Sequence, residues 1–234
     1  LLVTLFVGFL IGMGSGVNVC VAHTLGARDE QRTIENVHTS LLLCALMGLL
    51  MGTVCFFFSE WMLMLLHTKD DLLQQATLYL KIYAFGLPAM GIYALIMNHL
   101  FRRRDECHVS LKKIRLHKNI AVSILMIGIP AGIQNAIFAI ANLFVQVGVN
   151  SFDTVMVSGS AAATNADTLI FNVMYAFYTG CSSFISQNFG AGNKKRILQS
   201  YFISLFYAFT AGAILGLLLF LFGHQFLSLF ATDE

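Results

Sequence analysis

Six long apolar stretches, separated by short polar segments, make up most of the chain. They extend over about residues 1–21, 37–66, 72–101, 119–148, 161–189 and 197–230, and each holds at most one Asp, Glu, Lys or Arg. About 20 residues of helix cross the hydrocarbon core of a bilayer, so each stretch is long enough for one transmembrane helix. A membrane β-barrel would show short alternating strands instead of these continuous Leu, Phe and Ile runs. The pattern predicts an all-α, polytopic helical membrane protein with six transmembrane helices.

A line of polar residues runs along the fifth stretch. Its members stand three or four positions apart, which places them on one face of a helix: Asn165, Thr168, Asn172, Tyr175, Thr179, Ser182 and Ser186. The fourth stretch adds Gln134, Asn135, Asn142, Gln146 and Asn150. Uncharged polar groups in hydrocarbon need water or polar partners. Two such helices therefore predict a shared water-filled vestibule, and hydrogen bonds that hold the helices together are the alternative.

Small residues indicate where helices approach each other closely. Gly8, Gly12 and Gly16 stand four residues apart in the first stretch, and Gly48 and Gly52 do so in the second. A helix face without side chains allows a neighbouring helix to pack tightly. In the third stretch, Pro88 removes a backbone hydrogen bond and predicts a kink.

An internal repeat relates the two halves of the chain. A shift of 164 residues places Gly26-Ala27 on Gly190-Ala191, Arg32 on Arg196, Gly48 on Gly212 and Gly52 on Gly216, and the register holds without a gap from Gly16 to Thr68. Both copies run in the same direction through the predicted topology. A parallel repeat is typical of transporters built from two similar lobes, with the substrate site between them.

Composition and charge agree with this picture and orient it. The chain is 57% hydrophobic and 11% charged, whereas soluble domains carry about 25% charged residues. Of the 14 Lys and Arg residues, 12 lie in the segments 26–36, 102–118 and 190–196, which alternating spans place on one side of the membrane. The positive-inside rule makes that side cytoplasmic. The net charge of +2 does not favour nucleic acid as a partner.

Acidic residues and catalytic motifs are scarce in the predicted spans. Asp167 is a candidate for cation or proton coupling because carboxylates inside a membrane are costly to keep. Glu60, beside Trp61, is better placed at the membrane interface. The five cysteines and seven histidines show no metal-binding spacing, and the sequence holds no HExxH, GxSxG, P-loop or GxGxxG pattern. We therefore expect no enzyme activity, no metal site and no cofactor.

Four motifs resemble those of the multidrug and toxic compound extrusion (MATE) transporters. They are Gly26-Ala27-Arg28-Asp29, the segment from Tyr79-Leu80 to Gly86-Leu87-Pro88, the Ile-Gly-Ile-Pro-Ala-Gly-Ile-Gln run at 127–134, and the Ser-Gln-Asn-Phe-Gly-Ala-Gly run at 186–192. The resemblance extends over nearly the whole chain. It implies an antiporter with two six-helix lobes that exports organic cations in exchange for Na⁺ or H⁺.

On the template of that family, the six stretches correspond to helices 2, 3, 4, 7, 8 and 9. Helix 1, helices 10 to 12 and most of helices 5 and 6 have no counterpart, with a jump near Tyr93, so the chain is similar to an incomplete or internally deleted copy. Residues 1–101 would form a partial N-terminal lobe, 102–118 a basic inter-lobe loop, and 119–234 a partial C-terminal lobe. Some branches of the family carry an acid four residues after the Pro-x-Gly-x-Gln motif, a position that Phe138 occupies here.

The function predicted from these features is a secondary antiporter of a bacterial-type plasma membrane, with the lipid bilayer and a small organic cation as partners and Na⁺ or H⁺ as the coupling ion. The residues expected along the substrate and ion path are Gln134, Asn135, Asn142, Asn165, Asp167, Asn172, Tyr175 and Thr179. The alternatives are a lipid-linked oligosaccharide flippase of the same superfamily and a remnant that does not transport. A membrane-embedded enzyme is the rival from another class, and it would need converging catalytic groups in the spans.

Overall fold

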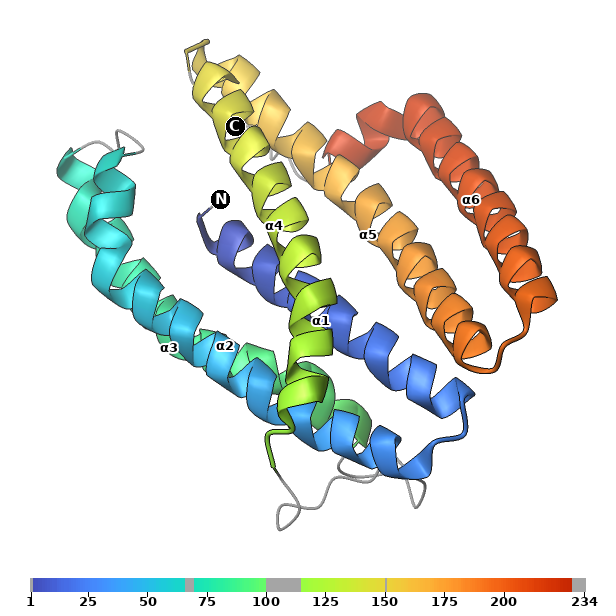
Figure 1. Cartoon of the computed structure of the whole chain (residues 1–234). Helices are drawn as coiled ribbons and strands as arrows, with labels where there is room; N and C mark the ends of the chain where they lie inside the picture. The colour runs from blue at the N-terminus through green and yellow to red at the C-terminus, as the bar shows by residue number, and fades with distance from the viewer. Residues whose placement is uncertain (1, 66–69, 100–114, 150, 229–234) are drawn as a thin grey trace.

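The structure is a computed structural model that describes residues 2–65, 70–99, 115–149 and 151–228. Six α-helices account for nearly all of these residues. They are α1 (Leu2–Gly26), α2 (Glu30–Leu65), α3 (Asp70–His99), α4 (Lys118–Val149), α5 (Thr154–Gly190) and α6 (Lys194–Ser228). The helices form an open bundle in which α2 and α3 lie on one side, α5 and α6 on the other, and α1 and α4 cross between them (Figure 1). No strand occurs among the described residues. The predicted all-α class is confirmed.

Most of the helices extend beyond the apolar stretches that predicted them. The polar segment 26–36 reduces to the turn at 27–29, because α2 already begins at Glu30, and α5 begins at Thr154 instead of near 161. Polar side chains cap these earlier starts: the carboxylates of Asp29 and Asp153 accept hydrogen bonds from the backbone N–H groups of Arg32 (3.0 Å) and Met156 (2.9 Å). Hydropathy marks only the part of a helix that lies in hydrocarbon, so it misses such polar ends.

Five of the six helices are long and apolar enough to cross a membrane. The sixth, α3, begins with Asp70 and Asp71 and carries Lys81, and it does not reach that criterion over its described residues. Large apolar side chains also cover the outside of the bundle; Phe220, for example, is 85% exposed and Phe209 is 75% exposed. An outer surface of this kind suits lipid rather than water.

Glycines form the closest helix contacts, as their spacing predicts. Gly8, Gly12 and Gly16 of α1 face α4, where a Cβ on Gly16 would lie 2.6 Å from the backbone nitrogen of Gly128. A Cβ on Gly52 of α2 would lie 2.8 Å from the carbonyl oxygen of Ala84 in α3. Both distances are shorter than a methyl group tolerates, so side chains at these positions would push the helices apart. The glycine seams therefore set the spacing of α1 from α4 and of α2 from α3.

The internal repeat is visible in the two turns that it pairs. In the α1–α2 turn Arg28 has a φ of 56°, and in the α5–α6 turn Gly192, 164 residues later, has a φ of 69°. Asp29 caps the N–H of Arg32 at 3.0 Å, and Asn193 caps that of Arg196 at 3.2 Å. The backbone hydrogen bonds of the two turns also match at the same shift, for example from Ala27 to His23 (3.0 Å) and from Ala191 to Gln187 (3.1 Å). Two segments with different side chains thus adopt one geometry.

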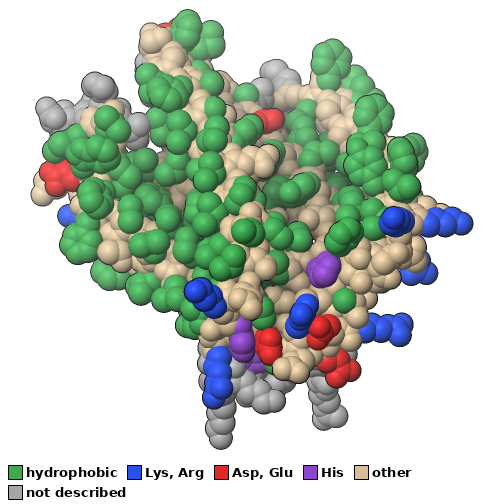
Figure 2. Space-filling view, in the orientation of Figure 1, with side chains coloured by type: hydrophobic (Ala, Val, Ile, Leu, Met, Phe, Trp, Pro, Cys, Tyr) green, Lys and Arg blue, Asp and Glu red, His purple; other side chains and the backbone are tan. Residues whose placement is uncertain are grey.

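Charged groups gather at one end of the bundle. The α1–α2 turn, the start of α4 and the α5–α6 turn lie at the same end, called the basic end below, and carry Arg28, Arg32, Lys118, Lys194, Lys195 and Arg196. Figure 2 shows charged side chains toward the lower end and right-hand edge of the face in view and mostly apolar ones above them. Much of the predicted basic loop 102–118 lies outside the described residues, as do Asn150 and the acidic residues 233–234.

Candidate functional site

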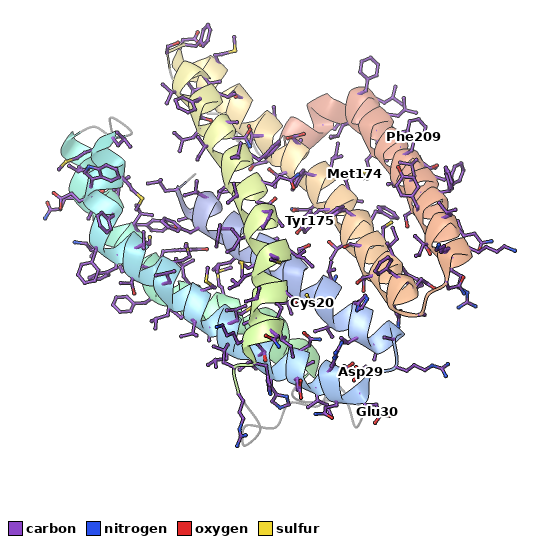
Figure 3. All side chains as sticks on the ribbon, viewed as in Figure 1. Cys20, Asp29, Glu30, Met174, Tyr175 and Phe209 are labelled. Atoms are coloured by element: carbon purple, nitrogen blue, oxygen red, sulfur yellow. The ribbon has the colours of Figure 1, made fainter. Side chains whose placement is uncertain are left out.

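A row of aromatic rings connects α4 to α5. Phe138 of α4 stacks on Phe171 of α5 with ring centroids 6.0 Å apart, and Phe171 stacks on Tyr175 at 6.1 Å. Tyr175 then contacts Tyr178 at 5.7 Å. Figure 3 shows Tyr175 on the side of α5 toward α4, whereas Met174 lies on the side toward α6, where its sulfur would be 3.3 Å from a Cβ on Gly212. Away from the turn that joins them, α4 and α5 make few direct contacts, so this row is the main bridge between them.

The row ends at a cavity of about 1180 Å³ on the basic side of the molecule. Tyr178 belongs to both the aromatic row and the cavity wall. Residues of α1, α2, α4, α5 and α6 contribute to the lining, together with His117 just before α4. In Figure 2 the face in view is hollowed between α4 and α6, over α5. The volume is slightly above the usual range of about 300–1,000 Å³ for small-molecule sites.

The cavity has a charged rim and an apolar wall. In the part of the lining that the structure describes, Arg32 and Lys118 are the basic residues, Glu35 is the one carboxylate, and His23 and His117 add two imidazoles. Arg32 pairs with Asp29 at 3.5 Å, and Glu35 accepts a hydrogen bond from Gln31 at 3.1 Å. The apolar part of the lining comes from Val19, Ile120, Ile127, Ile185 and Phe189. The cavity is therefore amphipathic, and Lys118 is the basic residue of its described lining that has no ion pair.

At the basic end, α1 and α5 pack closely against each other through two equivalent glycine contacts. A Cβ on Gly26 would overlap the carbonyl oxygen of Gln187, and a Cβ on Gly190 would overlap that of His23. Residues 23 and 187 are themselves 164 positions apart, so the two contacts are equivalent under the internal repeat. The closure buries Ser186, which donates a hydrogen bond to the carbonyl oxygen of Val19 at 2.6 Å, and the rings of His23 and Phe189 meet at 5.7 Å.

A polar cluster fixes the ends of α1, α2 and α4 beside this closure. Asn36 donates to the hydroxyl of Thr24 at 3.2 Å, which ties α2 to α1. The hydroxyl of Thr39 contacts Nδ1 of His117 at 3.2 Å and accepts from its backbone N–H at 3.3 Å, which ties α2 to the start of α4. Thr24, Asn36 and Thr39 are all buried. These bonds hold one wall of the cavity in place.

The structure distributes the predicted path residues over several environments. Asn135 donates to the carbonyl oxygen of Gly8 at 3.1 Å, so it serves the α1–α4 contact, and the hydroxyl of Thr179 donates to the carbonyl oxygen of Tyr175 in its own helix at 2.7 Å. The others, apart from half-buried Tyr175, are exposed: Gln134, Asn142, Asn165, Asp167 and Asn172. None of the eight lines the cavity, although Ser182 and Ser186 of the same polar line do. Their role in a transport path stays a prediction.

Sequence reasoning missed three members of the aromatic row. The polar line on α5 singles out Tyr175 alone, and it passes over Phe138, Phe171 and Tyr178. The spacing of 171, 175 and 178 is helical, so a search for aromatic residues on one face would have found them. Nothing in the sequence places Phe138 against them, because that contact joins two helices. Among the described residues, no group of three or more His, Cys, Asp or Glu is arranged to hold a metal ion.

The apolar helices, the internal repeat and the cavity at the basic end define a helical membrane protein. The chain belongs to the MatE family, whose model matches residues 1–102 and 130–234. A probable multidrug resistance protein of Bacillus subtilis, YoeA, is 21% identical to it in an alignment that covers 98% of this chain and 64% of the relative. A FAD transporter of Shewanella oneidensis is 27% identical over 68% of this chain and 33% of its own length.

Solved structures share the fold. A multidrug resistance MATE family transporter of the MOP superfamily, in an outward-facing conformation, superposes with a TM-score of 0.80 at 15% identity, covering 99% of this chain and 64% of that one. A MOP superfamily transporter from Pyrococcus furiosus, described as having a binding pocket of reverse polarity, gives a TM-score of 0.79 with the same identity and coverage.

The chain spans about 64% of the length of YoeA and of the two solved structures. The alignment with YoeA runs over 294 positions, more than the 234 residues of this chain, so the relative also carries residues inside the matched region that have no counterpart here. This agrees with the expectation of an incomplete or internally shortened MATE-like chain.

Proposed function

We propose that the transporter to which these helices belong is a secondary antiporter of the plasma membrane that exports organic cations in exchange for Na⁺ or H⁺. The basic end of the bundle faces the cytoplasm, as the positive-inside rule requires. The aromatic row that leads from Phe138 to the cavity at Tyr178 is the observation that carries this proposal.

The aromatic row suits a cation that is itself flat and apolar. The face of an aromatic ring attracts a cation within about 6 Å, and the interaction is stronger where water is excluded. The rings of the row contact one another and stay partly exposed, with Phe138, Phe171 and Tyr178 59%, 48% and 57% exposed, so they offer several aromatic surfaces instead of one deep site. A series of similar weak sites allows a substrate to move as well as bind, which is what a carrier of varied organic cations requires.

The closure of α1 on α5 suits alternating access. In transporters built from repeats, one half rocks against the other around a central site. Here the basic end is shut by two equivalent glycine contacts, and the described helices diverge from it toward the opposite end (Figure 1). The solved structure that superposes with a TM-score of 0.80 is itself described as outward-facing. Separation of Gly26 and Gly190 from the backbone opposite them would open the basic end.

Asp167 is the acid we assign to ion coupling within this chain. It lies exposed on α5 and has no hydrogen bond or ion pair with another described residue. Phe138, at the position where some branches of the family carry an acid, is instead committed to the aromatic row. A coupling role for Asp167 therefore does not compete with any contact among the described residues.

A transport assay on the complete reading frame tests the proposal. Sequencing of the genomic locus around this chain supplies that frame, and ethidium efflux is then measured from cells that lack their own exporters. We expect efflux, and we expect Tyr175→Ala to weaken apparent ethidium affinity by about 2- to 30-fold, the range that corresponds to ~0.5–2 kcal/mol for a cation on an aromatic face. Tyr207→Ala, on the exposed side of α6, is the matched control. A frame with no further helices and no efflux would refute the proposal and leave a remnant.

A further inference from the structure

We infer that the cavity at the basic end binds an anionic phospholipid, with the lipid phosphate at Lys118 and an acyl chain along the apolar wall between α4 and α5. The inference uses the cavity that Tyr178 borders but does not require transport. It rests on the orientation given above only in assigning the lipid to the cytoplasmic leaflet.

Lys118 is the group of the rim that attracts an anion. Among the described lining residues, Lys118 and Arg32 stand beside one carboxylate, Glu35, and His117 lies next to Lys118. Arg32 is engaged by Asp29 at 3.5 Å, whereas Lys118 forms no ion pair with any described residue. Lys118 is also the first residue of α4, so the unpaired N–H groups of the first helical turn add to the positive potential there. Lys118 is thus the strongest single attraction for a phosphate in the lining.

The wall behind this rim selects a ligand with an apolar tail. Moving along α4 from Lys118, the lining passes through Ile120 and Ile127, and Ile185 of α5 faces the same cavity. A soluble anion would leave these surfaces in contact with water, whereas an acyl chain covers them at a gain of about 25 cal/mol per Å². The basic rim and the apolar wall below it thus match the two parts of an amphiphile, its polar head and its apolar tail.

The cavity is also accessible from the lipid side. Phe189, Tyr201 and Ile127 belong to the lining, yet they are 66%, 49% and 40% exposed, and they continue into the apolar outer surface of α4, α5 and α6. A lipid therefore enters sideways from the bilayer without crossing a polar barrier. Basic pockets between transmembrane helices on the cytoplasmic side are a recurring form of lipid-headgroup site.

Lipid binding is measured on the purified chain in nanodiscs and by native mass spectrometry. Nanodiscs of phosphatidylcholine alone are compared with nanodiscs that contain phosphatidylglycerol in both leaflets, so the result does not depend on orientation. Lys118→Gln is compared with Lys194→Gln, because each lysine is the first residue of its helix and is exposed, but only Lys118 lines the cavity. Ile127→Trp fills the apolar part of the cavity and leaves the charge of the rim unchanged. Inorganic phosphate, added to protein in neutral detergent, tests the head group alone.

We expect phosphatidylglycerol to be retained and to raise the melting temperature above that in phosphatidylcholine. Lys118→Gln should weaken retention about fivefold, the equivalent of ~1 kcal/mol for one basic residue near an anionic lipid, while Lys194→Gln leaves it unchanged. Ile127→Trp should also reduce retention of phosphatidylglycerol. If Lys118→Gln does not fold, the retention measured with Ile127→Trp tests the inference in its place.

Three outcomes would overturn the inference: equal retention of the two lipids, equal loss in Lys118→Gln and Lys194→Gln, or a full stabilising effect of inorganic phosphate alone. None of them bears on ethidium efflux, so a failure here is distinct from a failure of the proposed function.

Discussion

The contact between Gly190 and the backbone of His23 gives the sharpest test of the packing at the basic end. Gly190 lies at the end of α5, where a Cβ would overlap the carbonyl oxygen of His23 and lie 3.0 Å from the backbone nitrogen of Ala27. Both neighbours are backbone atoms of α1 and the turn after it, so they cannot rotate away as a side chain would. Gly190→Ala therefore forces α1 and α5 apart at the point where they close.

The magnitude follows from two opposing terms. Overpacking by one methyl group in a tight contact costs about 1–3 kcal/mol. Replacement of glycine by alanine in a helix returns about 0.5–1 kcal/mol, and less at a helix end. The hydrogen bond from Ser186 to Val19, 2.6 Å long and buried beside the contact, adds about 1 kcal/mol to the loss if the helices separate enough to break it. We expect a net destabilisation of about 1–3 kcal/mol.

Gly180→Ala is the matched control, because Gly180 lies in the same helix and a methyl group there would meet no atom within 4 Å. It should be neutral or slightly stabilising. Thermal unfolding of both variants in one detergent measures the difference, and ~1 kcal/mol corresponds to roughly 2–4 °C in a domain of this size. A Gly190→Ala protein that melts at or above the temperature of Gly180→Ala would refute the described contact between α1 and α5.

Two further comparisons use the internal repeat as their own control. Gly52→Leu should destabilise the protein by about 1–3 kcal/mol, because Gly52 packs against α3. Gly216→Leu, at the equivalent position of α6 with no atom within 4 Å, should change the free energy of unfolding little. Arg28→Gly should raise stability by about 0.5–1 kcal/mol by removing a non-glycine residue from positive φ, and Gly192→Ala should lower it similarly. Chemical denaturation measures both pairs, and equal effects within either pair would contradict the structure.

Much of the architecture was predictable because membrane helices are specified locally. A bilayer requires every backbone polar group to be satisfied within its own helix, so a run of apolar residues suffices to predict a span. The glycine faces of α1 and α2 and the grouping of basic residues at one end follow from spacing and charge alone. The ends of the helices were placed less well, because capping by Asp29 and Asp153 extends them into polar sequence.

The candidate site was predicted less completely, because its parts come from separate helices. The polar line of α5 was visible in the sequence, but whether a member faces water or a partner depends on what lies opposite. Ser186 of this line donates a hydrogen bond to a carbonyl oxygen of α1 and so acts in helix packing, as does Asn135 of α4. The same line supplies Tyr175 to the aromatic row. There Tyr175 stacks on Phe171, which in turn stacks on Phe138 of α4.

The sequence by itself determined the helical membrane class, the number and direction of the apolar stretches, and the repeat at a shift of 164 residues. These depend on hydropathy, spacing and the placement of charge, which are properties of short segments. Only the tertiary structure decided that Gly26 and Gly190 face each other's helices, that an aromatic row bridges α4 and α5, and that a cavity with a basic rim lies at its end. Those features are contacts between helices, and they depend on the distance between residues in space and not on their separation in the sequence.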